Sequence, residues 1–288
     1  MYTNLNPRTM GLNHHSFDDL LTTAHNSGFK GIEVPAGAFG TPRAAAEAKI
    51  RLDDMGMRFG LIMAPCDMYK VDDGEFEKAL ATFDQWSRLA RIAGCTRAYN
   101  HIWPGSDTMG YEENFRWHVK RLEAIYRVLD DNGIRYGLEF MGPKTVRDQF
   151  KYGFIRSLMG VVALTQEVSR DIGFVFDTIH WYCSGSHQDD LYYAAMHPEK
   201  VINLHLCDAN APRDEQIDAT RGMPMENGII DAVEVVRLLA RHGYDGPVII
   251  EPMKPTTARY EAMPLQDAAR DAIGCLHRIF DAAGVQDV

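Results

Sequence analysis

The two stretches that decide the fold are GFVFDTIH (residues 173–180) and VINLHLCD (residues 201–208). Each is a short run of β-branched and aromatic residues, which is typical of a buried strand, and each becomes polar only near its carboxyl end. Longer amphipathic segments separate runs of this kind along the chain. This alternation predicts parallel strands joined by crossover helices.

The same alternation extends over the whole chain and predicts eight strand and helix units. The expected strands are residues 9–13, 31–35, 59–64, 98–103, 136–141, 173–179, 201–208 and 248–253. The expected helices are residues 17–26, 44–55, 76–92, 113–130, 158–169, 232–241 and 265–283, with a weaker pattern at 190–196. A chain of 288 residues with this repeat fits a single TIM barrel domain spanning residues 1–288. An open nucleotide-binding sheet is disfavoured because no Gly-rich dinucleotide or phosphate-loop pattern is present.

Composition argues against several classes of partner. The formal net charge is −10, so we expect no nucleic-acid partner, because the protein surface would repel a phosphate backbone. We find neither a secretory signal nor an apolar stretch long enough to span a membrane, and therefore expect a cytoplasmic protein with no membrane partner. The cysteines are widely spaced, and we expect reduced, mostly buried thiols at Cys66, Cys95, Cys183, Cys207 and Cys275.

Four consecutive predicted strands carry a metal-binding side chain late in the strand, namely Glu139, Asp177, His205 and Glu251. The carboxyl ends of the strands face the active site in barrels of this type. Any one of these carboxylates alone would be better explained by a structural ion pair. The four together, inside apolar runs where an unpaired charge is costly, favour a metal site. Three carboxylates and one imidazole suit Mn²⁺, Mg²⁺ or Co²⁺ better than a closed structural zinc site.

The motifs LEF, FDTIH, HLCDA and IEP resemble the strand-end motifs of the xylose-isomerase-like superfamily of sugar isomerases and epimerases. The likeness spans nearly the whole chain and is closest to the D-tagatose 3-epimerase and hydroxypyruvate isomerase type. It implies one divalent ion, Mn²⁺ in the first place or else Co²⁺ or Mg²⁺, bound by the four residues above. It also implies that Glu139 and Glu251 are the catalytic acid/base pair.

The activity that this resemblance implies is isomerisation or epimerisation of a keto-sugar or related polyhydroxy carbonyl compound through an enediolate. We therefore expect a small-molecule carbohydrate substrate, and a homo-oligomer in which the chain pairs with a second subunit. His180 matches a residue that contacts a substrate oxygen, and Arg213 matches a substrate-gripping arginine. Residues 210–228 form the longest irregular segment, which we expect to be a lid or a substrate loop.

Further substrate contacts are expected at the ends of the fourth and fifth predicted strands. His101 could donate a hydrogen bond to substrate and Trp103 could stack on a sugar face, although core packing explains both equally well. Lys144 lies close to Glu139 in the sequence, but a solvated loop lysine is the commoner situation. Glu33, late in the second predicted strand, is expected to support a metal ligand rather than to be one.

Two other functions stay open at this point. The position six residues after Glu139 is Thr145, where ketose 3-epimerases carry a second substrate-gripping glutamate, so a free ketohexose is not implied. A lyase of the same superfamily, either a dehydratase or an enzyme that cleaves 3-keto-glycosides or C-glycosides by β-elimination, is the alternative. An apurinic-site endonuclease is a remote alternative, because it needs more metal ligands and a basic surface.

Overall fold

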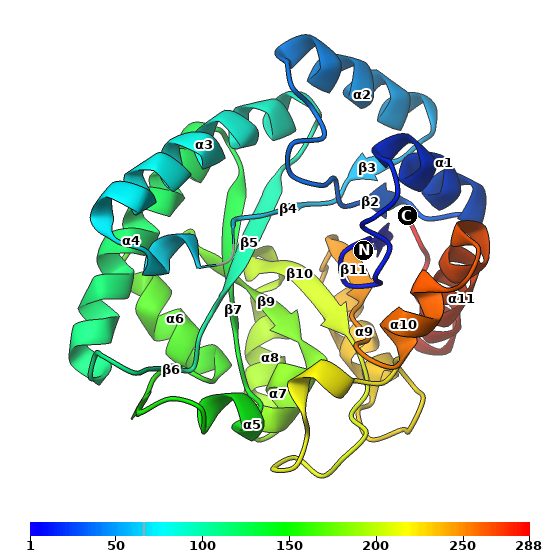
Figure 1. Ribbon diagram of the computed structural model, residues 1–288. Helices are drawn as coiled ribbons and strands as arrows, with labels where there is room; N and C mark the ends of the chain where they lie inside the picture. Colours follow the sequence, from blue (N-terminus) through cyan, green and yellow to red (C-terminus); the bar gives the residue numbers. More distant parts are fainter. Residues whose placement is uncertain (66) are drawn as a thin grey trace.

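The computed structural model describes residues 1–65 and 67–288, and it confirms the predicted barrel (Figure 1). One sheet has the strand order β3-β2-β1-β11-β10-β9-β7-β5-β4, and all its neighbouring strands are parallel. Its strands are β1 (Tyr2–Leu5), β2 (Gly31–Ile32), β3 (Arg58–Phe59), β4 (Ile62–Met63), β5 (Arg97–Ile102), β7 (Arg135–Phe140), β9 (Gly173–Asp177), β10 (Val201–Leu206) and β11 (Pro247–Ile250).

The sheet curls into a barrel because β3 and β4 are two halves of one stretch of chain, residues 58–63. The first half pairs with β2 and the second half pairs with β5, so the two edges of the sheet meet in this stretch. The sequence pattern predicted a single strand here. Gly60 and Leu61 separate the halves, and an added Cβ at Gly60 would collide with the Asn4 side chain, so only glycine fits between β1 and the split strand.

The helices surround the strands (Figure 1). They are α1 (Phe17–Ser27), α2 (Pro42–Asp54), α3 (Asp73–Ile92), α4 (Tyr111–Asp131), α5 (Lys144–Arg147), α6 (Leu158–Gln166), α7 (Thr178–Ser184), α8 (Gln188–Met196), α9 (Ala232–Arg241), α10 (Thr256–Glu261) and α11 (Leu265–Ala283). Several begin at a residue whose side chain accepts a backbone N–H of the first turn, as at Ser16, Thr41 and Asp72. Gly28 and Gly284 end α1 and α11 in the left-handed conformation.

The prediction of the first strand was wrong. Residues 9–13 form turns, in which Leu12 N–H donates to the Pro7 carbonyl and Gly11 has a φ of 72°. The first strand is Tyr2–Leu5. The sequence pattern did not indicate a buried strand here, because Thr3 and Asn4 are polar, yet both are buried in the structure. The side chain and N–H of Thr3 donate to the Asp287 carboxylate, which ties the end of the chain to β1.

Other differences lie near the carboxyl ends of the strands. The sixth predicted strand ends early, because the Asp177 carboxylate accepts the N–H of Ile179 and begins helix α7. The sequence patterns also missed the short helices α5 and α10 and the antiparallel pair β6 (Gly105–Ser106) and β8 (Tyr152–Gly153). All of these are too short for a periodic pattern to develop. No described helix is both long and apolar enough to cross a lipid bilayer.

The strands contribute side chains to two apolar regions, because successive residues of a strand face opposite sides of the sheet. Leu138, Phe176, Leu204 and Ile250 belong to the large cluster that packs under the helices. Their neighbours Glu139, Asp177, His205 and Glu251 therefore point the other way, into the barrel, because successive strand residues face opposite sides. Leu61, Tyr99 and Val175 form a separate small apolar cluster there. The described cysteines Cys95, Cys183, Cys207 and Cys275 are free and buried, as predicted, whereas Cys66 lies outside the described residues.

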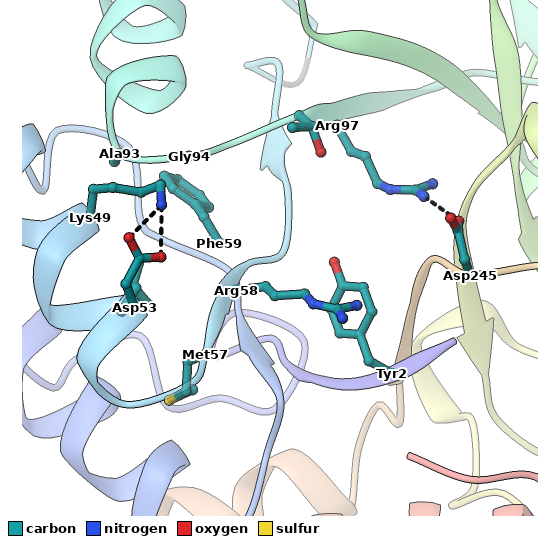
Figure 2. Close-up of a pocket in the computed structure, with 12 residues that line it drawn as sticks. Tyr2, Lys49, Asp53, Met57, Arg58, Phe59, Ala93, Gly94, Arg97 and Asp245 are labelled. Atoms are coloured by element: carbon teal, nitrogen blue, oxygen red, sulfur yellow. Dashed lines mark hydrogen bonds and ion pairs between the residues drawn. The ribbon is translucent and has the colours of Figure 1, made fainter. Parts of the chain in front are cut away.

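The opposite end of the barrel, where the strands begin, carries a pocket lined by charged residues, several of them paired (Figure 2). Arg97 is buried at the start of β5, donates to the carbonyl groups of Val201 and Ile202 at 3.2 Å each, and forms an ion pair with Asp245. The Arg58 guanidinium lies over the Tyr2 ring at 4.7 Å. A buried arginine requires such partners, since an unpaired buried charge is costly. The charged residues at this end of the barrel therefore have a structural role.

The close approach of β9 to β10 provides a test of the packing. The register of this pair shifts between Val201 and Asn203, and an added Cβ at Gly173 would meet the Lys200 carbonyl. We predict that Gly173→Ala lowers the free energy of unfolding by about 1–3 kcal/mol, because backbone must move to admit the methyl group. Urea denaturation should show no comparable loss for Gly40→Ala, where nothing lies within 4 Å of the added atom. Equal stability of both variants would contradict the strand packing described here.

Candidate metal centre

Four side chains from adjacent positions of the barrel converge at its carboxyl end. Glu139 lies in β7, Asp177 in β9 and His205 in β10, and Glu251 follows β11 directly. One ligand atom from each of them lies within 4.8 Å of the others, and all four side chains are buried. The register places His205 beside Asp177 and beside Ile249, two residues before Glu251. The curvature of the barrel therefore brings these four predicted residues to one point.

His205 Nδ1 is the centre of this arrangement. It lies 2.9 Å from Glu139 Oε1, 3.0 Å from Glu251 Oε2 and 3.7 Å from Asp177 Oδ2. A single N–H cannot serve three carboxylates. It makes its hydrogen bond to Glu251, and the buried Glu139 Oε1 is left without a hydrogen-bond partner. An unsatisfied buried carboxylate oxygen that faces a nitrogen and two further carboxylates needs a cation.

The other nitrogen of His205 is held by Asn203, two residues earlier on the same face of β10. Asn203 Nδ2 lies 2.7 Å from His205 Nε2, while the buried Asn203 Oδ1 has no partner. A half-turn of the amide would let Oδ1 accept a hydrogen bond from Nε2–H and leave the lone pair of Nδ1 available to a metal. Asn203 can therefore hold His205 in the tautomer that a metal ligand requires.

An arginine that the sequence analysis did not select completes the cluster. Arg221 is buried and donates from Nη1 to Asp177 Oδ2 at 2.8 Å and to Glu251 Oε2 at 2.7 Å. Its Nη2 donates to Asp218 at 2.7 Å and lies 3.3 Å from His180 Nε2. The predicted gripping arginine, Arg213, is exposed, and donates to the Tyr182 carbonyl and the Ser186 hydroxyl.

Arg221 lies in the irregular segment 210–228, and Asp208 holds this segment in place. The buried Asp208 carboxylate accepts the backbone N–H groups of Asn227, Gly228, Ile229 and Ile230 at 2.7–3.2 Å. The backbone of Asp208 also pairs with Gly222, the residue after Arg221. The segment is therefore anchored directly after the arginine that it directs into the site.

The charged side chains of the cluster shift one another's pKa values. Burial opposes ionisation of Asp177, but the neighbouring His180, Arg221 and His205 outweigh burial and hold the pKa of Asp177 well below its usual range. Burial likewise disfavours a charged imidazole, yet Glu251 and Glu139 raise the pKa of His205 well above its ordinary value. Without a metal, His205 and Arg221 together offset two of the three negative charges of these carboxylates.

The remaining predicted residues are divided between the site and its surroundings. His180 is buried, with Nε2 3.6 Å from Asp177 Oδ2 and Nδ1 accepting the N–H of Gly142. His101 is half-buried and packs edge-on against Trp103, and Trp103 Nε1 donates to Asp67. Lys144 is exposed and paired with Asp148, whereas the four central residues are buried.

The sequence reasoning missed Arg221 and Asn203, and only one of them carried a readable signal. Asn203 stands two residues before His205 in an apolar run, so strand alternation alone puts both on one face. Arg221 lies inside an irregular segment, where no periodicity says which side chain points inward. Arg213 was selected because it follows the motif HLCDANAP, where the resembling enzymes carry a substrate-gripping arginine. Arg221, eight residues further on, is the arginine of this segment that contacts Asp177 and Glu251.

The donor set fits a divalent ion of the hard or borderline kind. Three carboxylates and an imidazole nitrogen are the ligands that Mn²⁺, Mg²⁺, Co²⁺ and Zn²⁺ accept, and carboxylate-rich sets favour the harder ions. The orphaned Glu139 Oε1 and the partnerless Asn203 Oδ1 both become satisfied if an ion binds at the centre and Nε2 carries the proton. The structure thus defines a TIM barrel with a buried four-residue site that could hold one metal ion.

Comparison with known proteins gives the family. The chain belongs to the xylose isomerase-like TIM barrel family, whose model matches residues 21–279. No curated protein sequence matches the chain.

Solved structures repeat the fold over nearly the full length. A xylose isomerase domain protein from Alicyclobacillus acidocaldarius is 25% identical with a TM-score of 0.83, and 99% of each chain is covered. The IOLI protein, solved with a bound zinc atom, is 17% identical with a TM-score of 0.77 over 99% of this chain and 98% of that one. D-psicose 3-epimerase from Clostridium cellulolyticum H10, solved with D-tagatose, is 16% identical with a TM-score of 0.72 over 97% and 99%.

The raised pKa of His205 predicts that a metal must displace a proton. In the metal-free protein the imidazolium is stabilising at low pH, and this contribution is lost as pH rises through the raised pKa. A ligand imidazole must be neutral, so binding of Mn²⁺ at pH 7 should release about one proton, and the apparent affinity should rise about tenfold per pH unit below that pKa. Calorimetric titration in two buffers of different ionisation enthalpy measures the proton count. Binding without proton release would show that His205 is already neutral.

The position of Arg221 predicts a metal-dependent effect on stability. Arg221→Met should lower the free energy of unfolding of the metal-free protein by about 3–5 kcal/mol, because Asp177 and Glu251 lose a buried counter-charge. Saturating Mn²⁺ should recover part of this loss, since the dication replaces the missing charge. Denaturation with and without Mn²⁺ tests both points, and the exposed Arg213→Met serves as the control. A loss that Mn²⁺ leaves unchanged would assign Arg221 a packing role only.

Proposed function

We propose that this protein is a divalent-metal-dependent isomerase or epimerase of a keto-sugar or related polyhydroxy carbonyl compound. The observation that carries the proposal is the placement of two carboxylates about one point. Glu139 and Glu251 lie 2.9 Å and 3.0 Å from the same nitrogen of His205, and they come from β7 and the end of β11, with β9 and β10 between them. Two buried carboxylates that approach one centre from two sides suit proton removal and proton return.

The two carboxylates would act on the carbon next to a carbonyl group. A bound divalent ion would supply positive charge for the oxygens of a hydroxy-ketone and acidify the neighbouring C–H. One carboxylate, Glu139 or Glu251, then takes the proton, and an enediolate remains. Return of a proton to the opposite face of the same carbon gives epimerisation, and return to the neighbouring carbon gives isomerisation. Arg221 and His180 lie beside Asp177, where donors can orient substrate oxygens.

Mn²⁺ is the proposed ion, with Co²⁺ or Mg²⁺ as alternatives, because the set is rich in carboxylates. The zinc bound in the structurally similar IOLI protein supports a divalent ion without deciding its identity. A carbohydrate substrate is supported by the epimerase relative solved with D-tagatose. A cytoplasmic location agrees with the described cysteines, which are free.

Loss of Glu251 provides the direct test. In D₂O with Mn²⁺, we expect the wild-type protein to exchange deuterium into a carbon next to the carbonyl of an accepted ketose or 3-keto-glycoside. Glu251→Gln should slow this exchange by about 10²–10⁴-fold, because one of the two proton-transfer groups is lost. The exposed Glu112→Gln is the matched control, and NMR reports which carbon reacts.

The same experiment separates the alternatives. An unsaturated or released product in place of simple exchange would identify the lyase reaction, in which proton removal is followed by loss of a β group. Stoichiometric metal binding without exchange on any ketose or 3-keto-glycoside tested would reject the proton-transfer chemistry and leave the metal site in place. Exchange that survives in Glu251→Gln would reject its catalytic role.

A further inference from the structure

A second feature lies at the same end of the barrel, on strands that contribute none of the four central residues. A cavity of about 350 Å³ opens where β1, β2 and β4 end. Its polar residues include Asn6, Arg8 and Glu33, and its apolar wall includes Val34, Pro35, Ala36, Met63 and Trp86. This site, which we call the Arg8 cavity, combines one cation with a mainly apolar surface, as small-molecule sites commonly do.

The Arg8 cavity and the metal centre share Tyr99 as a neighbour. Arg8 Nη2 donates to the Tyr99 hydroxyl at 2.8 Å, and the Tyr99 ring stands edge-on to the His205 ring with centroids 5.4 Å apart and an interplanar angle of 87°. Tyr99 therefore contacts both the Arg8 guanidinium and a central histidine. A substrate that spans the two sites would have to pass beside the Tyr99 ring.

Arg8 has hydrogen-bonding capacity to spare. A guanidinium carries five N–H donors, and across residues 1–65 and 67–288 this one is used in a single hydrogen bond, to Tyr99, and in no ion pair within 4.0 Å. The buried arginines Arg221 and Arg97 differ, since both are paired with carboxylates. The cavity at the opposite end of the barrel likewise has its Lys49 paired with Asp53 (Figure 2).

Glu33 is the carboxyl group that could have neutralised Arg8, but its hydrogen bond is made elsewhere. Asn6 Nδ2 donates to Glu33 Oε2 at 2.5 Å. Burial raises the pKa of Glu33 to about 7; Arg8 and His205 oppose this shift, and Glu251 adds to it. A second anion nearby would favour the protonated form further, which turns Glu33 from a repelling charge into a hydrogen-bond donor.

We propose that the Arg8 cavity binds the end of the substrate remote from the metal, and that this end is a compact carbon framework carrying one carboxylate. The inference rests on the proposed function, because it requires the hydroxy-ketone end to be held at the metal centre. The apolar wall suits ring or chain carbons better than further hydroxyl groups. A carboxylate matches the single guanidinium in charge and in shape, whereas a phosphate dianion would exceed the one available cation.

The test uses planar mimics of an enediolate that differ only at the remote end. Catechol presents two adjacent oxygens to a metal, 4-methylcatechol adds an apolar group, and 3,4-dihydroxybenzoate adds a carboxylate at the same ring position. Calorimetric titration of the Mn²⁺-loaded protein under anaerobic conditions, with metal content checked afterwards, measures all three. We expect 3,4-dihydroxybenzoate to bind about 10–100-fold more tightly than 4-methylcatechol, the range of one charge-assisted hydrogen-bonded contact.

Two variants locate the effect in the Arg8 cavity. Arg8→Met should abolish the advantage of the carboxylate while leaving the affinity for catechol within about threefold, because catechol does not reach Arg8. Ala36→Leu should weaken both substituted catechols and spare catechol, since it fills the cavity from an exposed position. Arg43→Met removes an arginine whose side chain is 89% exposed and is the charge-matched control. Bound Mn²⁺ and the thermal midpoint of each variant show that it has folded.

The outcomes separate this inference from the proposed function. Tight binding of all three compounds with no gain from the carboxylate would overturn the inference and leave the metal-centred chemistry in place. A gain that persists in Arg8→Met would overturn the role of Arg8. Failure of all three compounds to bind the Mn²⁺-loaded protein would count against both proposals. A gain that is lost in Arg8→Met and kept in Arg43→Met supports the inference.

Discussion

The structure is organised around three carboxylates that converge inside the barrel at His205. Buried charges of one sign repel strongly and are poorly solvated, so such a cluster persists only with positive charge among its members. Two cations provide it, the imidazolium of His205 and the guanidinium of Arg221. The unsatisfied Glu139 Oε1 shows that this balance is incomplete. A divalent ion would complete it, and would need the proton of His205 to leave.

Much of the surrounding architecture serves to hold that balance. The barrel supplies the convergence, because strand ends that are neighbours in the sheet curve toward one axis. Asp208 supplies the counter-charge indirectly, since its carboxylate binds four successive N–H groups and anchors the segment that carries Arg221. Asn203 contacts Nε2 of His205 and can fix the tautomer of that histidine. Asp208 can therefore affect the charge of the centre through its hold on the segment that carries Arg221, although it is not one of the four central residues.

The sequence predicted the parts that follow from strand alternation, and it failed where alternation stops. The barrel and the positions of Glu139, Asp177, His205 and Glu251 in four successive strands were readable, because an ionisable residue in an apolar run is conspicuous. The first strand was misplaced, since Thr3 and Asn4 are buried through contacts with distant parts of the chain. Arg221 was not recognised, because the path of an irregular segment depends on anchors such as Asp208, which no local pattern reveals.

The two halves of the barrel carry different kinds of chemistry. β7 to β11 bring three carboxylates and a histidine together, a set suited to proton transfer on any hydroxy-ketone, while β1 to β4 bring an arginine with spare donors and an apolar wall. Tyr99 in β5 stands between them, hydrogen-bonded to Arg8 on one side and packed against His205 on the other. The two halves are nevertheless coupled by charge, since His205 and Glu251 both act on the pKa of Glu33 in the Arg8 cavity. Under the proposed function, Tyr99 would stand between the groups that transfer the proton and the group that selects the substrate.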